Sequence, residues 1–272
     1  MSECPVWHPD QKAYYWTDIE GSRLYKHDPV RGYTNFWTLS EQVGSFALTS
    51  RKPFLMAAAS GLSFFDPEIG LSEQIVQLAI PANGVMMNDG RVDSLGRFWV
   101  GSKSSNRTAR LYSIDATFTP IVKLENIGIS NGIDWSLDDQ FCYYTDSADN
   151  TIYRYKFDST SGIIYDREVF FVPQTGTPDG LCVDVKGNIW TALWDGWKLL
   201  QLDPDGNILF EVHLPVARPT SLCFGGESYT DLLITSASTG LTNEELAAQP
   251  MAGDIFYLPG LCQGRPSNRF IL

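Results

Sequence analysis

Short apolar segments recur along this chain in pairs, at a spacing of about 45 residues. Each segment alternates apolar and polar side chains or is wholly apolar, and β-branched and aromatic residues dominate it. Both patterns are typical of β-strands. The six pairs are residues 14–16 with 24–28, 54–56 with 62–66, 98–100 with 111–115, 142–144 with 152–155, 189–191 with 199–203, and 232–234 with 255–258.

Turn-forming residues separate these segments, as in Asp-Pro-Asp-Gly-Asn at 203–207 and Ser-Thr-Ser-Gly at 159–162. One repeat unit reads as a polar entry, a short strand, the paired strands and a further apolar strand. Six such units predict an all-β, six-bladed β-propeller with four antiparallel strands per blade, in a single domain over residues 1–272. A β-sandwich would not explain six copies at one period. Only residues 243–248 predict a helix, and a short one.

Closure of the ring depends on the last blade. Propellers usually complete it with a strand from the opposite end of the chain. The candidate here is Arg269-Phe270-Ile271-Leu272, which is short, so the sequence leaves the mode of closure open.

Oxygen-bearing side chains precede the first strand of four of the six units. They are Glu3, Asn88 with Asp89, Asn131 and Asp179. The first strand of each blade lines the central channel, so these positions face one another at the channel mouth. A glycine soon follows three of them and permits the close approach that a crowded axis requires. The sequence therefore predicts a functional site at the channel mouth.

Carboxylate and amide oxygens suit hard divalent cations such as Ca²⁺, Mg²⁺ or Mn²⁺, while Zn²⁺ and Fe²⁺ stay open as alternatives. Two carboxylates nearly neutralise a dication, and an asparagine carbonyl adds a neutral ligand. With three or four protein ligands, coordination positions stay open for water and substrate, as in a catalytic metal site. We expect one divalent metal cation at the mouth.

Charge and cysteine content narrow the class of protein. The formal net charge is −12, which argues against a nucleic-acid partner because phosphate binding needs a basic surface. No apolar run approaches the roughly 18 residues of a membrane span, and no signal peptide precedes the first strand. The five cysteines form no Cys-x-x-Cys pair and are expected to be reduced core residues. We expect a cytoplasmic monomer without a membrane partner.

Several motifs resemble those of the regucalcin/gluconolactonase/luciferin-regenerating-enzyme family of six-bladed propellers. The resemblance covers essentially the whole chain, in order. Its motifs are Glu-Cys-Pro-Val-Trp at 3–7, Asn-Asp-Gly-Arg-Val-Asp at 88–93, Ser-Asn-Gly-Ile-Asp-Trp-Ser at 130–136, Tyr-Tyr-Thr-Asp-Ser at 143–147 and Pro-Asp-Gly-Leu-Cys-Val-Asp at 178–184.

The resemblance implies a metal-dependent lactonase that opens sugar-acid lactones of the gluconolactone type. By resemblance, Glu3, Asn131 and Asp179 are the metal ligands, and Asn88 contacts metal-bound water or substrate. Asp179 is also implied as the general base. We hypothesise that the metal polarises the lactone carbonyl, and that Asp179 or a metal-bound hydroxide delivers the attacking water.

Two positions depart from the family pattern and bear on substrate choice. Met86 stands where the family often has an arginine, and Asn106 stands near the position of a glutamate used by some members. We expect Met86, Asn88, Lys103 and Asn106 to contact the substrate. Residues 194–197 (Trp-Asp-Gly-Trp) are a further candidate wall, although their tryptophans also suit packing between blades.

Two other functional classes remain for a propeller of this kind. A phosphotriesterase-like propeller hydrolase would need a second calcium site and a catalytic histidine, and His8, His27 and His213 all lie away from the mouth positions. A non-enzymatic calcium-binding propeller would need no polar mouth. It would bind metal without hydrolysing a lactone, so metal removal tests it.

Overall fold

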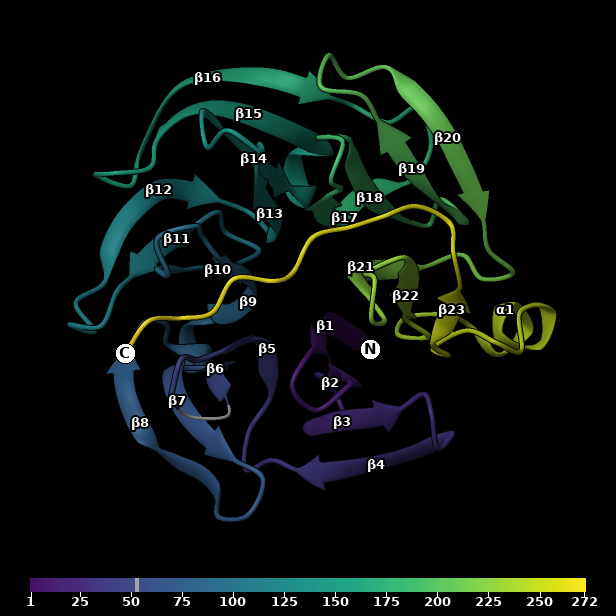
Figure 1. The fold of residues 1–272 in the computed structure, drawn as a ribbon, viewed down its shortest axis with the longest axis horizontal. Helices are drawn as coiled ribbons and strands as arrows, with labels where there is room; N and C mark the ends of the chain where they lie inside the picture. The colour runs from purple at the N-terminus through teal and green to yellow at the C-terminus, as the bar shows by residue number, and fades with distance from the viewer. Residues whose placement is uncertain (52–53) are drawn as a thin grey trace.

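Six antiparallel sheets surround a central axis in the computed structural model, which describes residues 1–51 and 54–272 (Figure 1). The six-bladed β-propeller is confirmed. The first three blades are β1 (Ser2–His8), β2 (Ala13–Asp18), β3 (Arg23–Asp28) and β4 (Tyr33–Thr38); β5 (Val43–Leu48), β6 (Phe54–Ala58), β7 (Gly61–Asp66) and β8 (Gly70–Gln77); and β9 (Met86–Val92), β10 (Phe98–Lys103), β11 (Ala109–Ile114) and β12 (Ile121–Ile127).

The remaining three blades continue in the same order. They are β13 (Ser130–Trp135), β14 (Phe141–Asp146), β15 (Thr151–Asp158) and β16 (Ile163–Phe171); β17 (Thr177–Val183), β18 (Ile189–Trp194), β19 (Lys198–Leu202) and β20 (Ile208–His213); and β21 (Pro219–Gly225), β22 (Asp231–Ser236) and β23 (Phe256–Leu258). Short 3₁₀-helices span Pro81–Asn83 and Ser147–Asp149. The expected helix is α1 (Asn243–Ala248), which begins with a capping box between Thr242 and Glu245.

Apolar side chains gather between neighbouring blades. Each of six buried clusters lies at one junction between two sheets; Tyr15, Phe46 and Phe54, for example, join the first blade to the second. Burying both faces of the inner strands explains why their sequences are apolar runs with little alternation. Cys4, Cys142, Cys182 and Cys223 are free and buried, as expected for core residues.

The turn after the first strand explains why Asp and Trp have the same spacing in two of the repeats. Asp93 accepts hydrogen bonds from the backbone of Leu95 and Arg97 and from the indole of Trp99, at 3.1, 3.0 and 2.8 Å. Asp184 binds Trp190 in the same way. One carboxylate thus fixes the turn and orients the tryptophan that packs between blades.

The candidate strand at residues 269–272 does not complete the last blade. Within the described residues the sixth sheet has three strands, β21, β22 and β23, and residues 269–272 do not join it. Phe270 instead forms a parallel bridge with Thr49 beyond β5. The first blade already contains four strands, so it supplies no strand to the last one, and Pro259 follows β23, where it ends the pairing.

Residues 259–272, which we call the C-terminal strap, cross the end of the channel opposite the mouth (Figure 1). Val185 donates its N–H to Gln263 O at 3.1 Å, and the Asn268 amide donates to Val92 O at 3.2 Å. Phe270 is fully buried between the second and third blades. The strap therefore ties several blades together. Among the described residues, no helix is long and apolar enough to cross a membrane.

Candidate functional site

A β-bulge interrupts the first strand of every blade near its start. The pairing shifts register between Glu3 and Val6, Val43 and Ser45, Met87 and Gly90, Ser130 and Ile133, Pro178 and Leu181, and Pro219 and Leu222. A bulge bends the strand and redirects its side chains. The mouth residues therefore lie within the strands, at the bulge, and not just before them as we had placed them.

Glycine at the bulge lets neighbouring inner strands approach closely. A Cβ on Gly132 would lie 2.4 Å from the backbone nitrogen of Leu181, and a Cβ on Gly180 would lie 2.8 Å from Ser221 Cα. Real Cβ atoms do not come this near to backbone. The crowded axis therefore accounts for these two glycines, as the sequence predicted.

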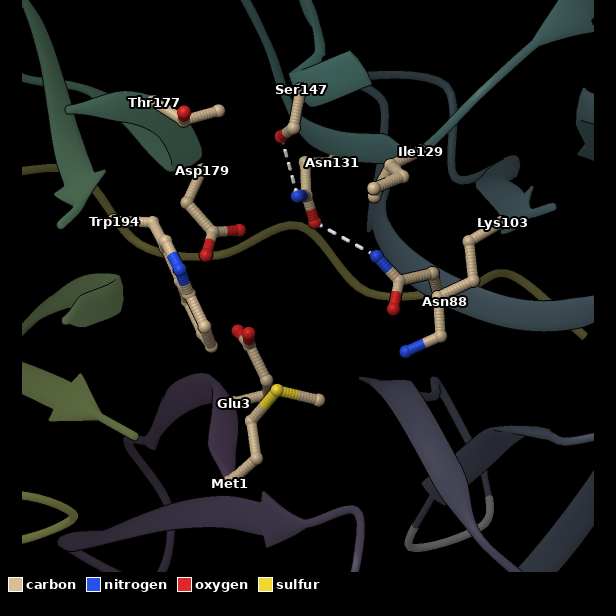
Figure 2. A pocket seen from close by; sticks show the side chains of 10 residues that line it. All are labelled: Met1, Glu3, Asn88, Lys103, Ile129, Asn131, Ser147, Thr177, Asp179 and Trp194. Carbon is tan, nitrogen blue, oxygen red and sulfur yellow. Dashed lines mark hydrogen bonds between the residues drawn. The ribbon is translucent and has the colours of Figure 1, made fainter. Parts of the chain in front are cut away.

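A pocket of about 340 Å³ opens at the channel mouth (Figure 2). Glu3, Asn88, Asn131 and Asp179 line it from four different blades, and each is less than a tenth exposed. Figure 2 shows both carboxylates and the Asn131 amide oxygen directed into the same space. Its walls are completed by Met1, Lys103, Ile129, Ser147, Thr177 and Trp194. A volume of this size suits a small molecule.

Hydrogen bonds fix the orientation of the Asn131 amide. Ser147 Oγ donates to Pro178 O at 2.6 Å, so it must accept from Asn131 Nδ2 at 2.7 Å. Asn131 Oδ1 then faces the pocket and accepts from Asn88 Nδ2 at 2.8 Å. Asn88 Nδ2 also donates to Ser130 O at 2.8 Å. Asn88 therefore positions Asn131 and turns its own carbonyl oxygen to the pocket.

The pKa values of the two mouth carboxylates, Glu3 and Asp179, are both raised. Burial, the Asp179 charge and the Asp89 charge hold the pKa of Glu3 well above its usual range. Burial and the Asp89 charge likewise hold the pKa of Asp179 well above its usual range, although the Lys103 ammonium works in the opposite direction. Asp179 Oδ1 is buried without a hydrogen-bond partner among the described residues. An acceptor of this kind is costly unless a proton, a cation or a ligand meets it.

Alternating charges continue from the mouth down the channel. Asp89 lies below the pocket, and burial raises its pKa while the Arg91 charge lowers it. Arg91 Nη1 contacts Asp134 Oδ2 at 3.0 Å, and Asp134 Oδ1 accepts from Arg265 of the C-terminal strap at 2.5 Å. The two carboxylates and two guanidinium groups of this series neutralise one another, and the mouth carboxylates take no part in this.

One pocket wall is aromatic. Trp194 ends β18 and lines the pocket, and the Arg218 guanidinium lies 4.8 Å from its ring centroid. Asp195 holds Arg218 through an ion pair at 2.6 Å. Stacking of this type restrains the indole. Trp197 is 43% exposed and lies outside the pocket, so only one of the two predicted tryptophans contributes to the wall.

The remaining candidates divide into two groups. Lys103 lines the pocket, whereas Met86 and Asn106 are not among its lining residues, and Asn106 is exposed. The sequence reasoning missed Met1, Ile129, Ser147 and Thr177 as lining residues. Of these, only Ser147 could have been identified from the sequence, because it ends the Tyr-Tyr-Thr-Asp-Ser motif at 143–147.

Histidine and cysteine do not contribute to this site. No histidine or cysteine of the described residues lines the pocket. His8 ends β1 at the far side of the channel, and His213 lies on an outer strand. Burial raises the pKa of the Cys223 thiol to about 12. A nucleophilic thiolate therefore has no support here.

The donor set fits a hard divalent cation. Within residues 1–51 and 54–272, no three His, Cys, Asp or Glu side chains group as a metal site, so the third donor here is an amide. Glu3 and Asp179 supply charge, Asn131 Oδ1 supplies a neutral oxygen held by Asn88, and the unpartnered Asp179 Oδ1 needs a partner. Oxygen donors of this kind match Ca²⁺, Mg²⁺ and Mn²⁺.

The fold and the site together define a six-bladed propeller with an oxygen-donor cluster at its channel mouth. Residues 1–238 match the family described as "SMP-30/Gluconolactonase/LRE-like region". The chain belongs to this family, as the sequence motifs indicated.

Individual relatives agree with this assignment. A Pseudomonas putida protein named 6-deoxy-6-sulfogluconolactonase is 35% identical over 261 residues, which cover 94% of this chain and 90% of that protein. Regucalcin of Gallus gallus is 30% identical over 272 residues, with coverage of 96% and 91%. The crystal structure of a calcium-binding protein, regucalcin, from Agrobacterium tumefaciens superposes with a TM-score of 0.95 at 26% identity, covering 100% of this chain and 94% of that one.

Proposed function

We propose that this protein is a lactonase that hydrolyses sugar lactones at the channel mouth, with one divalent cation. The observation that carries the proposal is the buried, unpartnered Asp179 Oδ1 beside Glu3 and the oriented Asn131 oxygen. Membership of a family whose relatives include named lactonases supports the choice of reaction. The pocket volume of about 340 Å³ suits a molecule of the size of an aldonolactone.

Glu3, Asn131 and Asp179 would hold the cation, which when bound supplies electrophilic activation of the lactone carbonyl. Asp179 has two oxygens, so one is free to accept a proton. It takes this proton from water as the water oxygen bonds to the carbonyl carbon. The bond from that carbon to the ring oxygen then breaks, and the proton passes to the ring oxygen, which becomes a hydroxyl. The product is the open-chain sugar acid.

The other lining residues orient the substrate. Trp194, restrained by Arg218, offers a flat apolar face against which a sugar ring can lie. Asn88 turns its carbonyl oxygen to the pocket, because its Nδ2 is occupied by two acceptors. That oxygen can accept a hydrogen bond from the attacking water or from a sugar hydroxyl.

Removal of the metal is expected to abolish the activity. EDTA treatment should lower hydrolysis of D-glucono-1,5-lactone by about 100-fold or more, because several kcal/mol of transition-state stabilisation are lost. A pH-indicator assay with glucono-, xylono- and arabinonolactones, repeated after adding Ca²⁺, Mg²⁺, Mn²⁺ or Zn²⁺, measures this. Equal hydrolysis of every lactone before and after EDTA would overturn the proposal. Metal binding without hydrolysis would instead support a non-enzymatic cation-binding protein.

The stabilisation given by the metal is expected to grow with pH. Because the pKa values of Glu3 and Asp179 are raised, the folded metal-free protein binds more protons than the unfolded chain. Its free energy of unfolding therefore falls as pH rises from the unfolded carboxyl pKa towards the folded one. A dication replaces those protons and removes the loss.

Thermal unfolding from about pH 4 to pH 8, with EDTA or with saturating CaCl₂, measures this effect. The rise in melting temperature caused by Ca²⁺ should increase across this range. Metal present at 100 times its Kd raises the free energy of unfolding by about 2.7 kcal/mol. A metal-induced shift that stayed constant with pH would contradict the assignment of Glu3 and Asp179 as ligands.

A further inference from the structure

Lys103 is a cation in the pocket wall without a counter-ion. It is the last residue of β10 and is half-buried. In the described part of the chain, no carboxylate lies within ion-pair distance of its Nζ, and its side chain makes no hydrogen bond. An ammonium group has three donors, and partial burial without a partner costs free energy.

The backbone partners of Lys103 carry apolar side chains. Met86 stands directly opposite Lys103 in the β9–β10 register, and Ile129 pairs with it on the other side. Neither side chain offers a charged or hydroxyl oxygen to the ammonium. Lys103 and Trp194 lie on opposite sides of the pocket in Figure 2. A molecule lying against Trp194 would therefore extend towards Lys103.

The charge of Lys103 is left over when the neighbouring charges are matched. Arg91 compensates Asp89, and Arg265 compensates Asp134 in the channel below. A dication would neutralise the charges of Glu3 and Asp179. Lys103 is close enough to lower the pKa of both carboxylates, but it is not paired with either. With the cation bound, one positive charge remains on the wall.

We propose that Lys103 binds an anionic substituent of the lactone, which makes the preferred substrate a sugar lactone that carries a second, negatively charged group. This rests on the proposed lactonase function and names its substrate class. The shared chemistry is a carboxylate, sulfonate or phosphate at the end of the sugar remote from the ester. The ammonium donates hydrogen bonds to its oxygens, with charge assistance.

The test compares kcat and KM for D-glucono-1,5-lactone with those for its 6-phosphate, its 6-sulfonate analogue and D-glucaro-1,4-lactone. Lys103→Met should raise KM for the anionic lactones by about 10- to 100-fold, with little change in kcat. The ratio of kcat/KM for the anionic lactones to kcat/KM for the neutral lactone should fall by about 10-fold or more. The three anions show which group fits best. Lys103→Arg should restore much of the affinity.

Calorimetry gives a readout that does not depend on turnover. Wild-type protein loaded with metal should bind 6-phosphogluconate more tightly than gluconate, and Lys103→Met should remove this difference. Lys156→Met is the matched control, since it removes one positive charge from an exposed site on another blade, where Lys156 pairs with Asp166. It should leave both affinities unchanged.

Two outcomes overturn the proposal. Equal losses for neutral and anionic lactones in Lys103→Met would mean that Lys103 acts on the carboxylate cluster. No loss for any lactone would mean that Lys103 acts neither on the anionic substituent nor on that cluster. Failure of the proposed function is distinguishable, because a wild-type protein that hydrolyses no lactone still reports on Lys103 through the difference between gluconate and 6-phosphogluconate binding.

Discussion

Asp179→Asn is expected to lower kcat for lactone hydrolysis by about 1,000-fold or more, because one substitution removes a cation ligand and the proton acceptor. Asparagine keeps the shape of the side chain and removes the charge. The pKa of Asp179 is raised by burial and by the Asp89 charge, so the carboxylate destabilises the metal-free fold at neutral pH. In EDTA, the variant should therefore be at least as stable as wild type while it is inactive with metal.

This combination separates a chemical role from a structural one. Lactone hydrolysis and thermal unfolding in EDTA are measured on the same preparations, and calorimetry shows whether the dication still binds. Asp205→Asn serves as the control, since it removes a carboxylate from an exposed turn of the same blade. Asp179→Asn with activity within about 10-fold of wild type would exclude Asp179 as the general base.

The propeller could be predicted because its strand signals are local. Each paired segment is apolar or alternating, and each is bounded by turn residues, so the six pairs coincide with the observed second and third strands. The C-terminal residues lacked such a signal. Residues 269–272 are strand-like in composition, but packing of Phe270 into the apolar cluster between the second and third blades decides their place. Tertiary packing overrode local propensity there.

The mouth residues could be predicted because they occupy one position in the repeat. The bulges could not, because they arise where neighbouring inner strands crowd one another, as the contact of Gly132 with Leu181 shows. Asn106 follows Lys103 by three residues, yet the loop turns it to solvent near Arg107, which has a φ of 54°. Side-chain direction in such a loop is not encoded in the periodicity.

The charged series below the mouth links the channel to the C-terminal strap. Asp134 is 3% exposed and accepts hydrogen bonds from Arg91, Arg265 and the Val183 backbone N–H. These groups come from three parts of the chain that lie far apart in sequence. Because these hydrogen bonds are buried and several, we expect Asp134 to stabilise the end of the channel that the C-terminal strap crosses.

Asp134→Ala is therefore expected to lower the free energy of unfolding by about 3 to 5 kcal/mol, since it leaves two guanidinium groups and the backbone N–H groups of Trp135 and Val183 without this acceptor. Urea denaturation at saturating metal measures this loss. Arg265→Leu should cost less, because Asp134 keeps Arg91 at 3.0 Å. Asp10→Ala breaks the exposed ion pair of the same strap with Arg269 and should cost less than about 1 kcal/mol. Equal losses in Asp134→Ala and Asp10→Ala would show that the buried series does not hold the strap.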